Sequence, residues 1–353
     1  MGIEIELTAP RVRRQLSGPA WKFGRSIRFA SVIAVLATAS LTGAFAAEVW
    51  MASLEPVWRA IHGWPANDYM RLFQADAPWG QAARGVKVFE VYKKFVEQSS
   101  DEDLSKVLGA LSRRGMALAM QGTPLIASEA CGLGVEGYGP PHDMKDAAAR
   151  VKRLGGIIDY IALDEPLYYG HVFTRRPLMN YETQAPAPCH SPIAELARET
   201  ALKIAEVRQV FPELKIGDVE PAGVFPAGGA EFRRMLREWF QAYEGATGRK
   251  FAFFDIDVVW LQPDWQSQFD DAVSVVREAG IPLGVIFNGT PTEPTDAAWL
   301  TSARAHIRLV ESKLGRPPDR AIFQSWTDHP RRILPETEPD SFTNLIKTYV
   351  ESH

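Results

Sequence analysis

The sequence predicts an α/β fold, specifically a single-domain (β/α)8 TIM barrel. The chain has 353 residues, 46% of them hydrophobic, which is enough apolar surface for a sizeable core. Eight short apolar runs are candidate strands, and helical segments alternate with the later ones. Strand–helix alternation repeated in this way is typical of a closed parallel barrel rather than an open sheet. We therefore expect the barrel to occupy residues 66–353.

Residues 1–46 have the order of a secretory signal peptide. Six basic residues precede an uncharged run from Phe29 to Ala47, and small residues surround Ala46. A membrane span is the competing interpretation, but the Ser, Thr and Gly residues within the run make it a weak permanent anchor. We expect cleavage near Ala46, an N-terminal extension over 47–65, a periplasmic or secreted location and no stable membrane span afterwards.

The charge of the chain disfavours nucleic acid as a partner. Residues 1–46 carry a net charge of +4 and the whole chain carries −4, which leaves −8 on residues 47–353. Nucleic-acid binding needs concentrated Lys and Arg, so this balance favours a neutral or small partner. The sequence has no dinucleotide fingerprint, phosphate-binding loop or nucleophile elbow, and we expect no cofactor.

The strands are predicted from short runs rich in apolar and β-branched residues, bounded by turn signals. They cover 69–73, 86–91, 116–120, 157–163, 215–219, 251–256, 281–287 and 320–326. Only residues 74–85 separate the first two runs. The first helix is therefore short or missing, or the first strand is misplaced.

Amphipathic segments between these runs predict the helices. The segment 101–115 opens on Asp101 and Glu102 and closes on Gly115, as helix capping and the helix dipole favour. The other predicted helices cover 142–156, 191–211, 230–248, 264–280 and 296–315.

Acidic residues gather at the predicted strand ends, where the functional groups of such barrels lie. Three neighbouring strands end in six carboxylates: Asp164, Glu165, Asp218, Glu220, Asp255 and Asp257. Other strand ends supply Glu90, Tyr92, Asn288 and Trp326. Any one carboxylate could cap a helix or pair with a cation. Together they repel one another unless a ligand, a metal or shared protons offset the repulsion, so the cluster predicts a functional site.

Asp164-Glu165-Pro166 at the end of the fourth strand, with Trp326 at the end of the eighth, resembles the clan A (β/α)8 glycoside hydrolases. The resemblance implies that Glu165 is the proton donor, that Asp164 replaces a sugar-binding asparagine, and that Trp326 is a platform for a sugar ring. This chain departs from the family at the end of the seventh strand, where Asn288 stands in place of the glutamate nucleophile. The expected substrate is an oligosaccharide or polysaccharide.

Without that nucleophile, glycoside cleavage can proceed by inversion. A second carboxylate then activates water at about 6.5–9.5 Å from the acid. Neighbouring strands are about 4.8 Å apart, so a partner two strands away suits inversion better than one on the adjacent strand. Asp257 is therefore the first candidate for the base, and Glu220 is the second.

Two long loops fit a binding role. Residues 166–191 are rich in aromatic residues and proline and include Tyr168 and His171, and residues 121–143 are rich in glycine. Each loop holds one of the only two cysteines, Cys131 and Cys189. In an exported protein this favours a disulfide that ties the loops together.

Two other functions fit part of the pattern. A metal-dependent sugar isomerase or epimerase could use Glu165, Glu220 and Asp257 as oxygen ligands, but no predicted strand ends in the histidine that such sites usually recruit. A sugar-binding barrel without catalysis is the other alternative. A polysaccharide lyase for uronic acids is disfavoured because the rim is acidic. The sugar, its linkage, the stereochemistry and the oligomeric state stay open.

Overall fold

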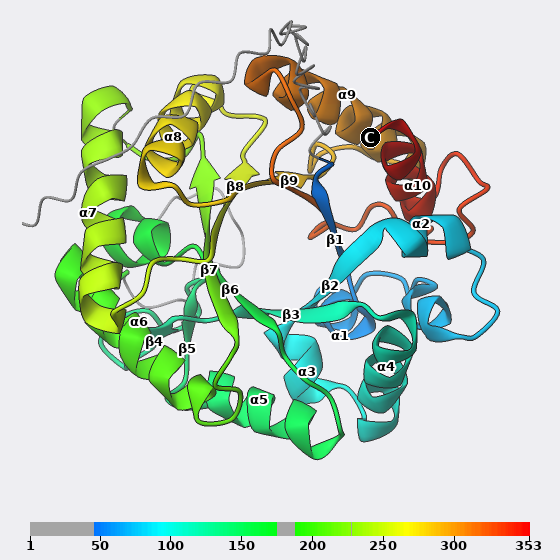
Figure 1. Ribbon diagram of the computed structural model, residues 1–353, viewed down its shortest axis with the longest axis horizontal. Coiled ribbons are helices and arrows are strands. Elements are labelled where there is room, and N and C mark those ends of the chain that lie inside the picture. Colours follow the sequence, from blue (N-terminus) through cyan, green and yellow to red (C-terminus); the bar gives the residue numbers. More distant parts are fainter. Residues whose placement is uncertain (1–45, 175–187, 227) are drawn as a thin grey trace, which may run out of the picture. The chain divides into compact units, whose positions relative to one another are not determined.

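The computed structural model describes residues 46–174, 188–226 and 228–353, and a closed barrel of parallel strands lies at its centre (Figure 1). Within these residues the barrel has eight strands, all paired in parallel. In order around the barrel they are β1 (Glu48–Ala52), β2 (Val86–Tyr92), β3 (Ala117–Gly122), β6 (Tyr160–Asp164), β7 (Lys215–Ala222), β8 (Phe253–Val258), β9 (Leu283–Phe287) and β10 (Arg320–Gln324). The predicted (β/α)8 fold is confirmed.

The helices surround the barrel and connect successive strands (Figure 1). They are α1 (Pro56–Ile61), the 3-10 helix η1 (Tyr69–Phe73), α2 (Gly80–Gly85), α3 (Lys93–Gln98), α4 (Asp101–Arg114), α5 (Asp143–Arg153), the π-helical turn η2 (Tyr168–Val172), α6 (Ile193–Arg208), α7 (Gly229–Thr247), α8 (Trp265–Ala279), α9 (Asp296–Leu314) and α10 (Phe342–Ser352). A two-stranded sheet, β4 (Leu125–Ile126) with β5 (Tyr138–Gly139), lies in the loop after β3. The predicted helices all form, and α4 ends at Gly115 with a left-handed φ of 65°.

The first strand was predicted in the wrong place. Residues 69–73 form η1, in which Tyr69, Leu72 and Phe73 are buried at the i, i+3, i+4 spacing of a helix. The barrel closes instead through β1, which pairs with β10 from Glu48↔Arg320 to Ala52↔Gln324 and with β2 on its other side. The expected N-terminal extension over 47–65 therefore contains β1 and α1. Most of the predicted signal peptide, residues 1–45, lies outside the described residues.

One inward-facing side chain from each strand fills the barrel interior. These residues are Trp50, Val88, Ala119, Ala162, Val219, Phe253, Ile286 and Ile322. The Trp50 ring packs edge-on against Tyr160 and Phe253, with centroids 5.0 and 5.3 Å apart. A Cβ at Gly217 would lie 1.9 Å from the Phe253 ring, so glycine is required there for the aromatic layer to form.

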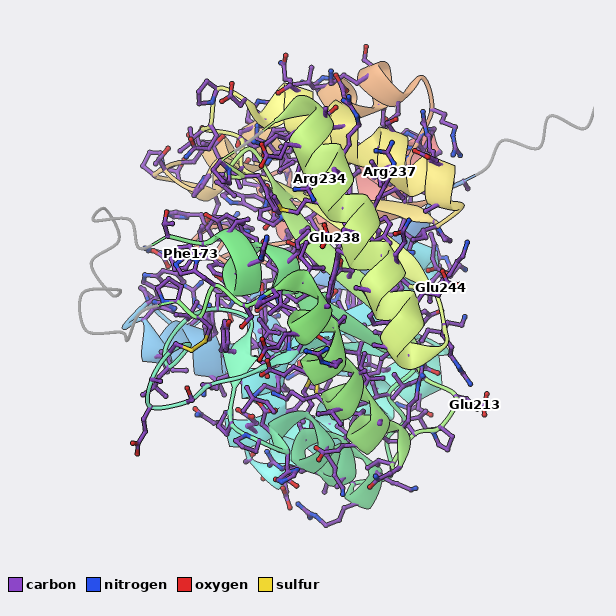
Figure 2. The ribbon with its side chains drawn as sticks, turned by 90° about the vertical axis from the view of Figure 1, so that its left-hand side faces the viewer. Phe173, Glu213, Arg234, Arg237, Glu238 and Glu244 are labelled. Carbon is purple, nitrogen blue, oxygen red and sulfur yellow. A yellow bond between two sulfur atoms is a disulfide. The ribbon has the colours of Figure 1, made fainter. Side chains whose placement is uncertain are left out.

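Helix α7 shows how the outer layer is built (Figure 2). Its buried face, including Trp239 and Phe240, packs on the barrel, while Arg234 and Glu238 form an ion pair of 2.9 Å on its exposed face. The two ends of the barrel lie on opposite sides of Figure 2. Phe173, which follows β6, is on the left, and Glu213, which precedes β7, is on the right. No helix among the described residues is long and apolar enough to span a membrane.

Candidate active site

Alternation along each strand decides which polar side chains enter the barrel. Successive side chains of a strand point to opposite faces, so the residue two positions after each interior residue also points inward. Toward the carboxyl ends the inward positions are therefore Glu90 and Tyr92 of β2, Gln121 of β3, Asp164 of β6, Asp255 and Asp257 of β8, Asn288 after β9 and Gln324 of β10. The mouth of the barrel is thus lined by carboxyl and amide groups.

Glu165 directly follows β6 and has a backbone that ordinary residues rarely adopt. Its φ of 49° lies in the left-handed region, which costs of order 1–3 kcal/mol for a residue other than glycine. Two carbonyls accept from its N–H, Leu163 at 3.2 Å and Val219 at 3.1 Å, and its own carbonyl accepts from the Tyr169 N–H at 3.0 Å. The surrounding structure therefore fixes this conformation.

The Glu165 side chain is buried, and its charged neighbours are carboxylates. It is 8% exposed, and no ion pair to Lys, Arg or His forms on it among the described residues. Burial raises its pKa well above the usual range of a glutamate, and repulsion from Glu136, Asp257 and Asp164 adds to the effect. Such a carboxyl group holds a proton at pH values where an ordinary glutamate has lost it.

Asp164 and Asp257 flank Glu165 and each accept one side-chain hydrogen bond from an amide. Gln121 Nε2 donates to Asp164 Oδ1 at 2.6 Å, and Asn288 Nδ2 donates to Asp257 Oδ1 at 3.3 Å. Burial raises the pKa of Asp257 to about 7, aided by the charge of Glu136 and opposed by the Asn288 hydrogen bond. Burial and Glu136 also raise the pKa of Asp164.

Glu136 belongs to this cluster, and sequence reasoning missed it. It lies in the loop after β3, and Tyr169 OH donates to Glu136 Oε2 at 2.6 Å. The next residue, Gly137, has a φ of +77°, and a Cβ there would lie 2.6 Å from the Asp164 carbonyl oxygen. The loop therefore lies directly on the end of β6. The sequence signal that could have identified Glu136 is its place beside Gly137 in the loop 121–143, to which a binding role was already assigned.

The predicted disulfide between Cys131 and Cys189 is present, with a Cα–Cα distance of 5.0 Å. It joins the loop that carries Glu136 to the chain that follows η2. The expected link between two rim loops is confirmed, although residues 175–187 of the second loop lie outside the described residues.

Asp218 and Glu220 do not face the interior, which corrects the expectation for β7. Val219 is the inward residue, so both acidic neighbours point toward the helices. Asp218 Oδ2 accepts from Trp239 Nε1 of α7 at 2.7 Å. The Glu220 carboxylate accepts from the backbone N–H groups of Leu167 and Tyr168 at 2.6 and 3.0 Å. Glu220 therefore supports the turn after Glu165, and its place does not suit a base in the mouth.

Asp255 enters the barrel but is already paired. It forms a buried ion pair with Arg320 of β10, whose guanidinium also lies over the Phe253 ring at 4.1 Å from the centroid. This pair lies below the mouth and does not suit contact with a substrate. Glu90 lies near it, and burial raises the pKa of Glu90 to about 8, with repulsion from Asp255 adding and Arg320 opposing.

The remaining predicted binding residues have mixed positions. Tyr168 is buried and packs edge-on against Phe173 and Phe225, which corrects its expected exposure to a ligand. His171 Nδ1 contacts the Ser191 carbonyl at 2.9 Å. Tyr92 OH accepts from Gln324 Nε2 at 3.1 Å and donates to the Ser325 carbonyl at 3.2 Å. Trp326 is 37% exposed and so has a ring face available to solvent.

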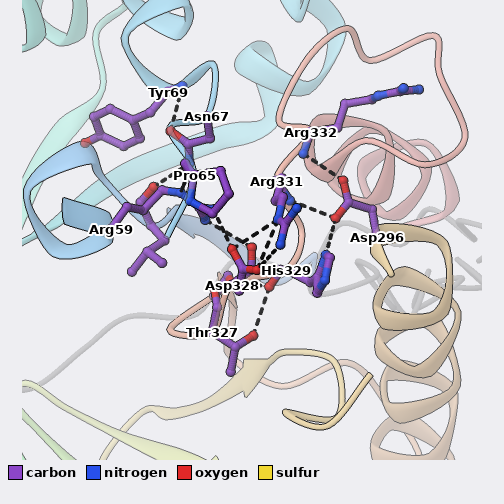
Figure 3. A network of polar contacts seen from close by, with 12 residues as sticks. Arg59, Pro65, Asn67, Tyr69, Asp296, Thr327, Asp328, His329, Arg331 and Arg332 are labelled. Carbon is purple, nitrogen blue, oxygen red and sulfur yellow. Dashed lines mark hydrogen bonds and ion pairs between the residues drawn. The ribbon is translucent and has the colours of Figure 1, made fainter. Parts of the chain in front are cut away.

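The loop after β10, which carries Trp326, is held by an ionic network (Figure 3). Buried Arg59 pairs with Asp328 at 2.6 Å, and Asp296 contacts His329 Nδ1 at 2.5 Å. The Asp296 carboxylate also accepts from the backbone N–H groups of Arg331 and Arg332, each at 2.9 Å. His329 and Asp328 therefore have structural partners. Within the described parts of the chain, no group of His, Cys, Asp and Glu is arranged to hold a metal ion.

No family model matches the chain, and no curated protein matches it. Among solved structures, the β-mannanase from the blue mussel Mytilus edulis is 11% identical and covers 86% of this chain and 92% of its own, with a TM-score of 0.46. The Ignisphaera aggregans GH53 catalytic domain is 11% identical and covers 79% and 84%, with a TM-score of 0.45. A putative fructose-1,6-biphosphate aldolase from Coccidioides immitis is also 11% identical and covers 87% and 88%, at 0.43. At these values the likeness assigns no activity.

Proposed function

We propose that the protein hydrolyses a glycosidic bond in an extracellular or envelope saccharide, with Glu165 as general acid and Asp257 as general base. The observation that carries this proposal is the environment of Glu165. Its carboxyl group is buried at the mouth of the barrel among other carboxylates, and this raises its pKa. A general acid has to hold a proton until the leaving group needs it, and this environment supplies that property.

The positions of the two strands favour inversion. β7 separates β6 from β8, so Glu165 and Asp257 come from strands about 9–10 Å apart. This spacing leaves room for a water molecule beneath the sugar ring. Glu165 gives its proton to the glycosidic oxygen as the bond to the anomeric carbon breaks. The water attacks that carbon from the opposite face, and Asp257 takes the proton of the water.

Replacing Glu165 with Gln tests the proposal. We expect Glu165→Gln to keep the melting temperature close to that of the wild type and to lower turnover by at least about 100-fold on a substrate with a poor leaving group. The matched control is Glu213→Gln, the same change in an exposed glutamate before β7. A panel of glycans followed by NMR identifies the substrate and the anomer released first. Near-normal turnover by Glu165→Gln would remove the assignment.

A sugar-binding barrel without catalysis is the second candidate, because Asn288 stands where the clan A hydrolases that the sequence resembles supply a nucleophile. The same panel separates the two functions. Binding of a glycan without release of product, unchanged by Glu165→Gln, supports a binding protein. Release of a reducing end that depends on Glu165 supports the hydrolase.

A further inference from the structure

The amide of Asn288 lies between Asp257 and the indole of Trp260. Asn288 is 2% exposed and follows β9. Its Nδ2 donates to Asp257 Oδ1 at 3.3 Å, and its Oδ1 accepts from Trp260 Nε1 at 2.5 Å. The two ends of one amide therefore contact a carboxylate and an indole N–H.

The indole fixes the orientation of that amide. An indole N–H can only donate, so the amide atom that faces Trp260 has to be oxygen. The NH2 group then faces Asp257, where it stabilises the ionised carboxylate. If the amide turned over, its oxygen would face the carboxylate and the indole would lose its acceptor. Trp260 thus selects the orientation that favours a negatively charged Asp257.

His306 of α9 holds both of these residues. Its ring stacks on Trp260, with centroids 3.7 Å apart and planes 8° apart, and its Nδ1–H donates to the Asn288 carbonyl at 2.9 Å. Burial lowers the pKa of His306, which favours the neutral ring. One histidine therefore anchors the backbone of Asn288 and the ring that orients its side chain.

We propose that Trp260 and His306 are positioning residues that act through Asn288 to keep Asp257 in the ionised, oriented state that a general base requires. This inference rests on the proposed function, since it assigns a role to supports of the proposed base. Neither residue needs to contact the substrate.

Titration of Asp257 tests the proposal without any substrate. The probe is protein labelled with 13C at the aspartate carboxyl carbons, in which the Asp257 signal is assigned by its absence in Asp257→Asn. Other carboxylates that act electrostatically with Asp257 are Glu136 from the loop after β3, and Asp164 and Glu165 at the end of β6. These stay unchanged in the variants, so a displaced midpoint reports the Asn288 hydrogen bond.

Trp260→Phe keeps an aromatic ring against His306 and removes the N–H donor. Burial raises the pKa of Asp257 to about 7, and we expect its midpoint in Trp260→Phe to lie about one pH unit above that of the wild type, as the loss of one hydrogen bond to a charged group predicts. The control is Trp265→Phe, a buried ring that packs edge-on against the same indole, with centroids 5.0 Å apart. An unchanged midpoint in Trp260→Phe, or an equal rise in Trp265→Phe, would overturn the proposal.

His306→Phe carries the test if Trp260→Phe does not fold. It keeps the stacked ring, loses the bond to the Asn288 carbonyl, and is expected to raise the same midpoint by a smaller amount. An unchanged midpoint in this variant would equally overturn the proposal. Once a substrate is known, the acid limb of kcat/KM should move with the Asp257 titration while the basic limb stays. A wild type that hydrolyses no glycan would remove the proposed function, whereas the titration would still decide how Asp257 is held.

Discussion

At the scale of single residues, the buried ion pair between Asp255 and Arg320 depends on a glycine in the strand between them. The Asp255 carboxylate lies over Gly284 of β9, and a Cβ at Gly284 would lie 1.9 Å from Asp255 Oδ1. Because β9 lies between β8 and β10, the missing side chain lets Asp255 reach Arg320 across it. The buried ion pair and this glycine therefore form one arrangement.

We expect Gly284→Ala to lower the free energy of unfolding by about 3 kcal/mol. The new methyl group displaces the Asp255 carboxylate, and a weakened buried pair leaves a charge without full compensation. The measurement is urea denaturation at pH 7. Gly245→Ala is the matched control, since a Cβ at this position in α7 meets nothing within 4 Å. That control should raise stability by about 0.5–1 kcal/mol through helix propensity. A loss of similar size in both variants would contradict the explanation.

At the scale of elements, the loops after β3 and β6 form one unit at the mouth. The disulfide joins them, the backbone of Gly137 rests on the carbonyl of Asp164, and Tyr169 OH contacts Glu136. The carboxylate that sequence reasoning missed is thus held in place by both loops. Loosening either loop should move Glu136 away from Asp164 and Glu165.

We expect reduction of the Cys131–Cys189 bridge to lower the free energy of unfolding by about 2–4 kcal/mol, since the bridge restricts the unfolded chain over a separation of 58 residues. Denaturation with and without a reductant measures the difference. A double variant, Cys131→Ser with Cys189→Ser, should be as unstable as the reduced protein and should not respond to the reductant. A midpoint in the wild type that does not change on reduction would show that the bridge adds no stability.

Strand periodicity and composition were sufficient to predict seven of the barrel strands, six of the surrounding helices and most of the residues at the strand ends, but the C-terminal helix α10 and the short helices α1, α2 and α3 were not predicted. The first strand was missed because EVWMA directly follows the apolar N-terminal run, whereas YMRLF has strand-like residues at helical spacing. The choice between Asp257 and Glu220 also required the structure. Sequence places both acidic pairs near the rim, but only the packing of Val219 shows that Glu220 points outward.

Two features of the site were not predicted from the sequence. One is a residue in a loop, and the other is an ion pair between two strands. Glu136 lies well past the end of β3, so no strand pattern places it over Asp164. The pairing of Asp255 with Arg320 depends on which strands are neighbours in the closed barrel, and on a glycine between them. Periodicity along one element carries neither kind of information.

Across the whole molecule, several carboxyl groups in and around the barrel are buried, and burial raises their pKa values. Asp257 and Glu55 reach about 7 and Glu90 about 8. The pKa values of Asp164, Glu165, Asp218 and Glu220 are also raised. The folded protein therefore holds protons that the unfolded chain releases above about pH 4. Proton binding to the folded state is favoured over a wide range of pH.

This distribution predicts that stability falls as pH rises from about 5 to 8. The folded state binds more protons than the unfolded state in this window, so the free energy of unfolding decreases with pH until the folded groups ionise. Thermal melts at constant ionic strength measure the trend. Glu90→Gln should flatten the slope, because a group with a folded pKa of about 8 no longer titrates. Asp101→Asn should leave the slope unchanged, since its carboxyl has a pKa of about 2 beside Arg153 and Arg150 and stays ionised throughout. A melting temperature that rises between pH 5 and 8 would contradict the prediction that these buried carboxyl groups, taken together, bind more protons in the folded protein than in the unfolded chain.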